Sequence, residues 1–237
     1  MAGTLTDRDN FIWLLSGLIF LLFSGAIFAQ FDFEEGQKVV NISLMITLLV
    51  GVWTLETKKQ RWMNPKIAMT LAIVILMVGD SIIESNFMAK GQLIGAFLFF
   101  SLTTFQAGNQ VLFTGYVDTN KIIGAICVYI LLGLVWAFAY LIVEAFIPGS
   151  LSGLTNELWQ GNLQDTIYYS MVTLTTLGYG DITPEQPLVR FLAYMEAITG
   201  IFYTTVLVAS LIGLRLADIQ PEYEQKAMLD ENRPEQS

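Results

Sequence analysis

A short stretch in the last third of this 237-residue chain has residue types and spacing that suit chemistry carried out by backbone carbonyl groups. Residues 168–181 read Tyr-Tyr-Ser-Met-Val-Thr-Leu-Thr-Thr-Leu-Gly-Tyr-Gly-Asp. Gly178 and Gly180 are separated by one residue, and glycine adopts positive φ at little steric cost. Alternating backbone conformations of this kind turn successive carbonyl oxygens toward one axis.

The rest of the chain offers few groups for other chemistry. It has no histidine, which excludes His-ligated metals, imidazole acid–base catalysis and histidine pH switches. Its one cysteine, Cys127, lies in an apolar run, which excludes an internal disulfide and a cysteine cluster for zinc or iron–sulfur. No nucleophile, base and metal ligands converge in the pattern, so we expect no enzyme. The net charge of −9 argues against nucleic-acid binding.

The elements that must hold the stretch are apolar helices. The chain is 54% hydrophobic and 14% charged, against about 25% charged in a soluble domain. Because a bilayer core of ~30 Å needs about 20 helical residues, we predict an all-α membrane protein with six transmembrane helices. The third apolar run reaches that length only if Asp80 lies inside the membrane. The six runs cover residues 11–29, 39–55, 67–79, 91–117, 122–143 and 197–214.

The basic residues predict the orientation of the six helices. With both termini in the cytoplasm, nine of the twelve Lys and Arg fall on the inner side, and only Lys38, Lys90 and Arg190 fall outside. We therefore expect a multi-pass protein of the cell membrane with cytoplasmic N- and C-termini. The outer segments are acidic, which would concentrate cations by field focusing; alternatively, acidic residues simply collect where basic ones do not.

The interval 146–190 between the last two apolar runs is too polar to span. It opens on a Pro148-Gly149 turn, and Asp165–Leu174 reads as a short helix with an acidic residue at its start. A helix followed by non-helical backbone at membrane depth must be buried by protein or line a water-filled path. The sequence therefore predicts a re-entrant loop with a pore helix.

Residues 175–181 resemble the selectivity filter of the potassium channel superfamily, six-transmembrane one-pore type, whose signature is T-V-G-Y-G. The match lies at Thr176, Gly178, Tyr179 and Gly180, with Leu177 in place of valine. The resemblance implies a channel that conducts K⁺ passively, with no cofactor and with K⁺ ions bound in the filter. It implies a homotetramer too, since one copy of the filter needs four chains to form a ring. The implied K⁺ ligands are Thr176, Leu177, Gly178, Tyr179 and Gly180; the implied filter supports are Tyr168, Tyr169, Thr175 and Asp181.

The last apolar run also resembles the inner helix of that family. Gly200 follows Gly180 by twenty residues, where many potassium channels carry a hinge glycine. The alternative is that Gly200 lets another helix approach closely. A stripe at helical spacing then predicts cavity-lining residues, although lipid-facing packing explains it equally well. The stripe is Ile201, Thr204, Val208 and Ile212.

The first four runs match the family only in number. Residues 91–120 carry no Lys or Arg, so a charge-moving fourth helix is ruled out. We expect a four-helix domain at 1–120, a pore domain at 121–215 and a short acidic tail at 216–237. A weakly selective K⁺/Na⁺ channel and a silent regulatory subunit remain alternatives, and the gating stimulus stays open.

Several charged residues carry weaker expectations. Asp80 and Glu84 lie one helical turn apart, either as intramembrane acids or as a helix end that emerges into water. Glu196 precedes Gly200 by one turn and is a candidate contact of the pore helix. A basic group near the inner surface would bind anionic lipid head groups or simply anchor the helices. That group is Lys58, Lys59, Arg61 and Lys66.

Overall fold

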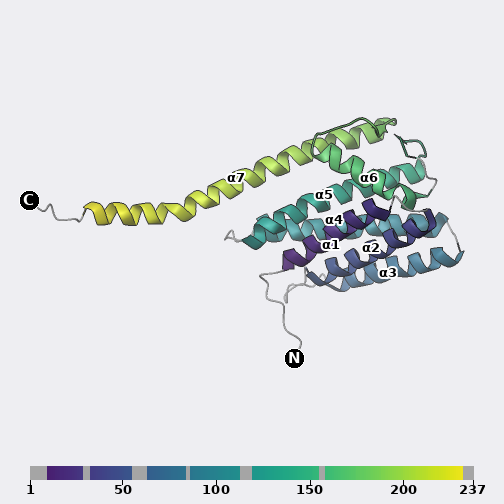
Figure 1. Cartoon of the computed structure of the whole chain (residues 1–237), viewed down its shortest axis with the longest axis horizontal. Helices are drawn as coiled ribbons and strands as arrows, with labels where there is room; N and C mark the ends of the chain where they lie inside the picture. The colour runs from purple at the N-terminus through teal and green to yellow at the C-terminus, as the bar shows by residue number, and fades with distance from the viewer. Residues whose placement is uncertain are drawn as a thin grey trace, which may run out of the picture.

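The computed structural model of the chain is a bundle of helices from which one long helix extends (Figure 1). The structure describes residues 10–28, 33–54, 63–83, 86–112, 119–154 and 158–231. These residues form seven helices and a two-stranded ribbon. The elements are α1 (Asn10–Phe28), α2 (Phe33–Thr54), α3 (Met63–Ile83), α4 (Asn86–Leu112), α5 (Thr119–Phe146), β1 (Leu151–Ser152), α6 (Trp159–Leu174), β2 (Thr183–Pro184) and α7 (Pro187–Glu231).

The helices α1 to α5 lie side by side around one apolar core. Phe99 and Phe100 of α4 are fully buried, and the ring of Phe100 stacks on Phe138 of α5. The packing joins α4 to α5 and α1 to both α2 and α5. The helix α5 therefore packs against α1 and α4 of its own chain, and α2 and α3 pack against those two helices in turn.

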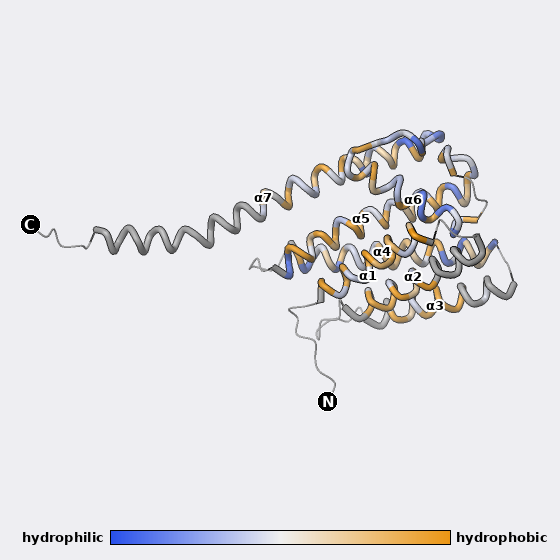
Figure 2. Tube along the Cα trace, in the orientation of Figure 1, coloured by the Kyte–Doolittle hydropathy of each residue, from blue (hydrophilic) through white to orange (hydrophobic). Residues whose placement is uncertain are grey.

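Apolar residues recur along the helices of the bundle (Figure 2), and several of them are exposed. Phe23, Leu71, Ile75 and Phe105 are exposed on α1, α3 and α4. Helices that are apolar on both the inner and outer faces are typical of a lipid environment. By length and composition, two stretches of the described residues can cross a membrane, and three shorter ones are apolar. The two long stretches are Asn86–Val111 and Asn120–Phe146. The three shorter ones are Phe11–Ile27, Ile42–Val52 and Ile67–Leu76.

The helical fold class predicted from the sequence is confirmed by these elements. Six spans and the orientation of the termini stay predictions. At the C-terminal end, α7 runs without a break from Pro187 to Glu231. Residues 216–231, expected as a separate short tail, therefore continue the inner helix.

The pore helix α6 begins earlier than the sequence predicted. It starts at Trp159, so Asp165 lies in its second turn and the prediction of an acidic helix start is wrong. Leu158 precedes the helix in an extended conformation and supplies no side-chain cap. The first turn is instead held by packing, because the Trp159 indole is buried and donates a hydrogen bond to the Ala89 carbonyl of α4 at 2.9 Å.

A small antiparallel ribbon connects the two flanks of α6 at the end of the bundle. Strand β1 pairs with β2, with Ser152 opposite Thr183, and the two hydroxyl oxygens lie 2.7 Å apart. Gly153 has a φ of 90°, and a Cβ at this position would lie 2.8 Å from the Asp181 carbonyl oxygen. The segment that precedes α6 is thereby fastened to the segment that follows residue 180.

Candidate functional site

The backbone after α6 alternates between ordinary and left-handed conformations. Thr176, Gly178 and Gly180 have φ values of 59°, 56° and 83°, whereas Leu177 and Tyr179 between them have negative φ. The sequence indicated that Gly178 and Gly180 permit positive φ, but it gave no sign of positive φ at Thr176. Such alternation turns successive peptide groups so that their carbonyl oxygens can share one side.

The end of α6 explains why Thr176 is left-handed. The Leu177 N–H donates to the Val172 carbonyl at 2.8 Å, and the Thr176 N–H donates to the Thr173 carbonyl at 2.9 Å. With Thr175 as the C-cap residue, these two bonds form a Schellman motif, which needs a left-handed residue at the position of Thr176. Glycine usually occupies that position, so a threonine there hides the motif from sequence analysis. We refer to residues 176–180 as the strand. Its first positive φ is therefore part of the termination of α6.

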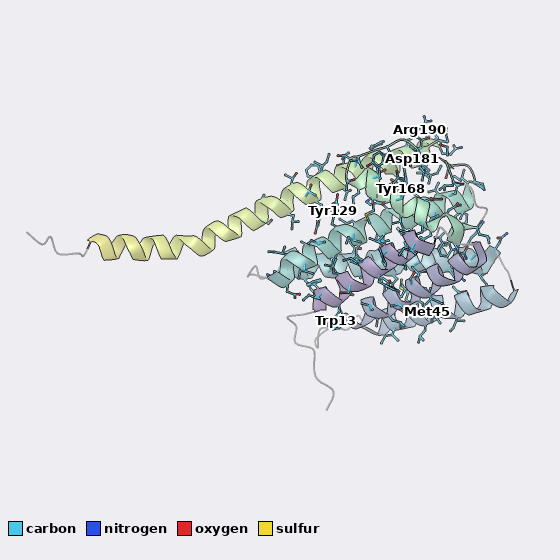
Figure 3. All side chains as sticks on the ribbon, in the orientation of Figure 1. Trp13, Met45, Tyr129, Tyr168, Asp181 and Arg190 are labelled. Carbon is cyan, nitrogen blue, oxygen red and sulfur yellow. The ribbon has the colours of Figure 1, made fainter. Side chains whose placement is uncertain are left out.

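Tyr168 of α6 contacts the strand at the end that leads to Asp181, and the two residues lie near each other (Figure 3). The Tyr168 hydroxyl donates to Oδ2 of Asp181 at 2.7 Å. The Tyr168 ring also stacks on Tyr179, with 6.4 Å between ring centroids and 6° between the planes. The hydrogen bond from Tyr168 lowers the pKa of the Asp181 carboxyl below its ordinary value. Asp181 is therefore held in its charged form at the outer end of the strand.

Tyr169 and Thr175, the other two expected supports, have different surroundings. Tyr169 is buried and packs edge-to-face on Tyr140 of α5, in a small core with Leu151 and Ile182 beside the ribbon. Thr175 is exposed, and its Oγ1 donates to the Met171 carbonyl at 2.7 Å. Tyr169 thus joins α6 to the outer ribbon, while Thr175 caps the end of α6.

The side chains of Leu177 and Tyr179 are exposed in the single chain, by 57% and 68% respectively. In a selectivity filter of the kind that residues 175–181 resemble, we expect both side chains to point away from the axis and to pack behind the strand. Tyr179 does meet Tyr168, but Leu177 has most of its surface open. Among the described residues of the single chain, none covers this apolar side chain fully.

Gly200 lies directly against the end of α6. A Cβ at this position would lie 2.0 Å from the Leu174 carbonyl oxygen, which also accepts a hydrogen bond from Tyr129 of α5 at 3.3 Å. The helix α7 is continuous on both sides of Gly200. This contact favours the alternative in which the glycine allows close packing of helices.

The expected cavity stripe begins on the same helix. Ile201 and Thr204 are exposed, and the Thr204 hydroxyl donates to the Gly200 carbonyl at 3.0 Å. Val208 and Ile212 belong to α7, but their side chains lie outside the described set, as do those of Lys66 and Asp80 on α3. Lys58, Lys59, Arg61 and Glu84 lie wholly outside the described residues.

Two glutamates at the site join separate elements, and for one of them, Glu196, the sequence had indicated a contact with the pore helix, which the structure contains. Glu196 of α7 is fully buried, and its carboxyl meets Ser170 of α6 and Tyr140 of α5. Glu144 at the end of α5 accepts hydrogen bonds from the N–H groups of Gly149 and Leu151 at 2.7 and 3.0 Å and from the Ser150 hydroxyl. The sequence did not identify Tyr140 or Ser170 as partners of Glu196, or the contacts of Glu144, because these partners come from other elements or from an irregular turn.

Comparisons with known proteins identify the C-terminal part of the chain. A family model described as "Ion channel" matches residues 124–214, which include α6, the strand and much of α7. The chain is 27% identical over 103 residues to "Two-pore potassium channel 3" of Arabidopsis thaliana, an alignment that covers 42% of this chain and 23% of that protein.

Two prokaryotic proteins are similar over the same part. "Protein LctB" of Geobacillus stearothermophilus is 36% identical over 78 residues, which cover 31% of this chain and 56% of that protein. "Voltage-gated potassium channel" of Aeropyrum pernix is 32% identical over 92 residues, which cover 38% of this chain and 27% of that protein. The chain thus spans between 23% and 56% of the length of these three curated relatives. No solved structure matches the chain.

Proposed function

We propose that the chain, with its ion-channel domain at 124–214, forms a channel that conducts K⁺ passively and selectively across the cell membrane. The observation that carries this proposal is the run of alternating positive φ at Thr176, Gly178 and Gly180, directly after the pore helix. Backbone carbonyls of this strand would replace the water around a K⁺ ion. Their partial charges bind an ion weakly enough to release it, as rapid conduction requires.

Four copies of the chain would surround one central axis. A ring of carbonyl oxygens needs more than one strand, and the sequence contains one. The exposed side chains of Leu177 and Tyr179 support this arrangement, because neighbouring copies would cover them. The same argument applies to an exposed apolar face of α7, formed by Leu188, Phe191, Ile198, Ile201 and Phe202.

Ions would meet the outer acids before they enter the strand. Asp181 keeps its charge because Tyr168 lowers the pKa of its carboxyl, and a fixed negative charge raises the local concentration of cations. Within the strand, repulsion between ions at neighbouring sites moves them forward. The Thr176 hydroxyl adds an oxygen ligand at the inner end. Transport of this kind needs no catalytic group.

The four N-terminal helices form a domain that does not move gating charge. Residues 91–112, the larger part of α4, contain no Lys or Arg. A voltage sensor needs such charges, each worth ~2.3 kcal/mol per 100 mV. The expected six spans, the cytoplasmic termini and a binding site for anionic lipid near Lys58, Lys59, Arg61 and Lys66 belong to the same proposal.

Gating through α7 would involve Gly200. Bending at Gly200 would swing the inner half of α7 and open the inner mouth of the pore. Because Gly200 lies against the Leu174 carbonyl, the same movement would disturb the end of the pore helix. We therefore propose that opening at Gly200 and the geometry of the filter are linked.

Purified protein in liposomes tests the proposal directly. We expect K⁺ flux from the protein alone, with a reversal potential in mixed K⁺ and Na⁺ that follows K⁺. Gly178→Ala should assemble normally but lose selective conduction, because alanine at a φ of 56° is strained. Equal flux of K⁺ and Na⁺ would favour a weakly selective channel, and no flux without a second protein would favour a regulatory subunit. Unchanged K⁺ flux in Gly178→Ala would overturn the assignment of the filter.

A further inference from the structure

Among the residues that the structure describes, Glu196 is a buried carboxyl group without a charged partner. It has no exposed surface, and in the described part of the chain no Lys or Arg forms an ion pair with it. The titratable groups that face it are tyrosines: Tyr129 and Tyr140 from α5 and Tyr169 from α6. A buried carboxylate without a cation is costly, whereas a neutral carboxylic acid needs only hydrogen bonds.

The hydrogen bonds around Glu196 can be counted proton by proton. The Tyr140 hydroxyl lies 2.6 Å from Oε2 of Glu196, and the Ser170 Oγ lies 2.5 Å from Oε1. The same Ser170 Oγ lies 2.7 Å from the Gly133 carbonyl oxygen. Each of these three oxygen–oxygen contacts needs a proton between its atoms. Tyrosine and serine hydroxyls supply one proton each and a carbonyl supplies none, so the third proton must come from Glu196.

The resulting chain of donors has one direction. Tyr140 donates to Oε2 of Glu196, the protonated Oε1 donates to Ser170, and Ser170 donates to the Gly133 carbonyl. We call Tyr140, Ser170, Glu196 and the Gly133 carbonyl the Glu196 cluster. It joins α5, α6 and α7 at one point.

The cluster lies one helical turn before the end of the pore helix. Ser170 and Leu174 are four residues apart on α6, and the Leu174 carbonyl is held by Tyr129 and lies against Gly200. Contacts with α5 and α7 therefore hold the last turn of α6 at two positions, Ser170 and Leu174. Because Thr175 and Thr176 follow directly, a shift of this turn would displace the first carbonyls of the strand.

We propose that Glu196 is a neutral carboxylic acid that positions the selectivity filter by fastening the pore helix to the inner helix. It is a positioning residue, since it acts on the ion path through Ser170 and α6. The effect on conduction rests on the proposed function, whereas the protonated state of Glu196 does not.

Substitution of Glu196 by glutamine tests whether Glu196 supplies the third proton. In Glu196→Gln the side-chain N–H would donate to Ser170 and the side-chain oxygen would accept from Tyr140, so the three contacts survive. Glu144 is the matched control, because it accepts from three donors: Gly149 N–H, Leu151 N–H and the Ser150 hydroxyl. A glutamine there would place its own N–H against one of those donors. The same substitution should thus be tolerated at one site and harmful at the other.

Conduction measurements follow from this contrast. In liposomes we expect Glu196→Gln to keep the K⁺ over Na⁺ permeability ratio of the unsubstituted protein. Glu196→Leu removes both hydrogen bonds and should lower that ratio by about tenfold. Glu144→Gln should impair channel activity, unlike Glu196→Gln. If Glu196→Gln loses selectivity as Glu196→Leu does, or if Glu196→Leu keeps it, the positioning role is wrong.

Infrared difference spectroscopy tests the protonated state without any need for conduction. The spectrum of the purified protein at neutral pH minus that of Glu196→Gln should contain the C=O stretch of a protonated carboxylic acid. Carboxylate stretching bands in its place would overturn the proposal even if the protein conducts K⁺. Conversely, a protein that shows the acid band but conducts no K⁺ would refute the proposed function and leave the Glu196 assignment intact.

Discussion

At the scale of single residues, Thr176 occupies the most demanding position of the strand. A non-glycine residue in the left-handed region costs about 1–3 kcal/mol. The Schellman bonds of Val172 and Thr173 at the end of α6 oppose that cost. A glycine would adopt this conformation more easily, but it would lack the hydroxyl that Thr176 offers to an ion. We therefore propose that ligand chemistry rather than backbone preference accounts for the threonine at position 176.

Two substitutions distinguish the effect of the Thr176 hydroxyl on conduction from the effect of its strained backbone. Thr176→Ala removes the oxygen ligand, so we expect weaker K⁺ binding and a several-fold lower single-channel conductance. Thr176→Ser keeps the hydroxyl and should conduct nearly as the unsubstituted protein does. Equal conductance of the two variants in symmetrical K⁺ would show that the hydroxyl is not a ligand.

The Tyr168–Asp181 hydrogen bond predicts a dependence on external pH. Tyr168 holds the pKa of Asp181 below its ordinary value, so the carboxylate keeps its charge as the solution becomes acidic. Tyr168→Phe removes the donor, and the pKa of Asp181 should rise toward about 3.9. As external pH falls, the K⁺ conductance of Tyr168→Phe should therefore decline at a higher pH than that of the unsubstituted protein. Superimposable conductance–pH curves from single-channel recordings would contradict this expectation.

At the scale of elements, α6 is held between α5 and α7 because two glycines let it approach. A Cβ on Gly133 of α5 would lie 2.6 Å from the Met171 side chain, and one on Gly200 of α7 would lie 2.0 Å from the Leu174 carbonyl. The first contact is with a flexible side chain, which can move. The second is with backbone, which can yield only if the pore helix itself shifts. Gly200 is thus the more sensitive of the two positions.

Gly200→Ala distinguishes close packing from a hinge. If close packing dominates, the new methyl group displaces the Leu174 carbonyl and reduces K⁺ over Na⁺ selectivity, as measured by reversal potentials. If Gly200 acts only as a hinge, open probability changes and selectivity does not. Gly108→Ala on α4 is the matched control, because a Cβ there meets nothing within 4 Å. A selectivity change in Gly108→Ala as well would remove the packing explanation.

At the scale of the whole molecule, the apolar surface of the single chain has two different roles. The exposed residues of α1, α3 and α4, such as Phe105, belong to faces that suit lipid. Those of α7 and the strand, such as Phe202 and Leu177, belong to the part that matches the ion-channel family. Four-fold assembly would bury the second group and leave the first in lipid.

Phe202 and Phe105 form a matched pair for the test of assembly, since they are 67% and 69% exposed in the single chain. Phe202→Ala should weaken the tetramer, because it removes apolar surface from the proposed interface. Phe105→Ala should leave the tetramer unchanged. Native mass spectrometry of the detergent-solubilised protein measures the fraction of four-chain species. Equal fractions in the two variants would argue against an interface on this face of α7.

The sequence by itself determined the features that depend on neighbouring residues. The apolar runs predicted the helices, since helix formation and burial follow from local hydrophobicity. The spacing of Gly178 and Gly180 marked two positions where positive φ is permitted, and both have it, because glycine has no Cβ to oppose this conformation. The resemblance of residues 175–181 to a potassium-channel filter pointed to the family whose model matches residues 124–214.

Only the tertiary structure decided the features that join distant residues. The start of α6 depends on a bond from Trp159 to α4 rather than on Asp165, and the left-handed Thr176 depends on how α6 ends. Gly133, Ser170 and Glu196 are far apart in the sequence and meet because three helices pack at one point. Such contacts have no period or spacing that a sequence pattern could reveal, since each is set by the packing of the whole bundle.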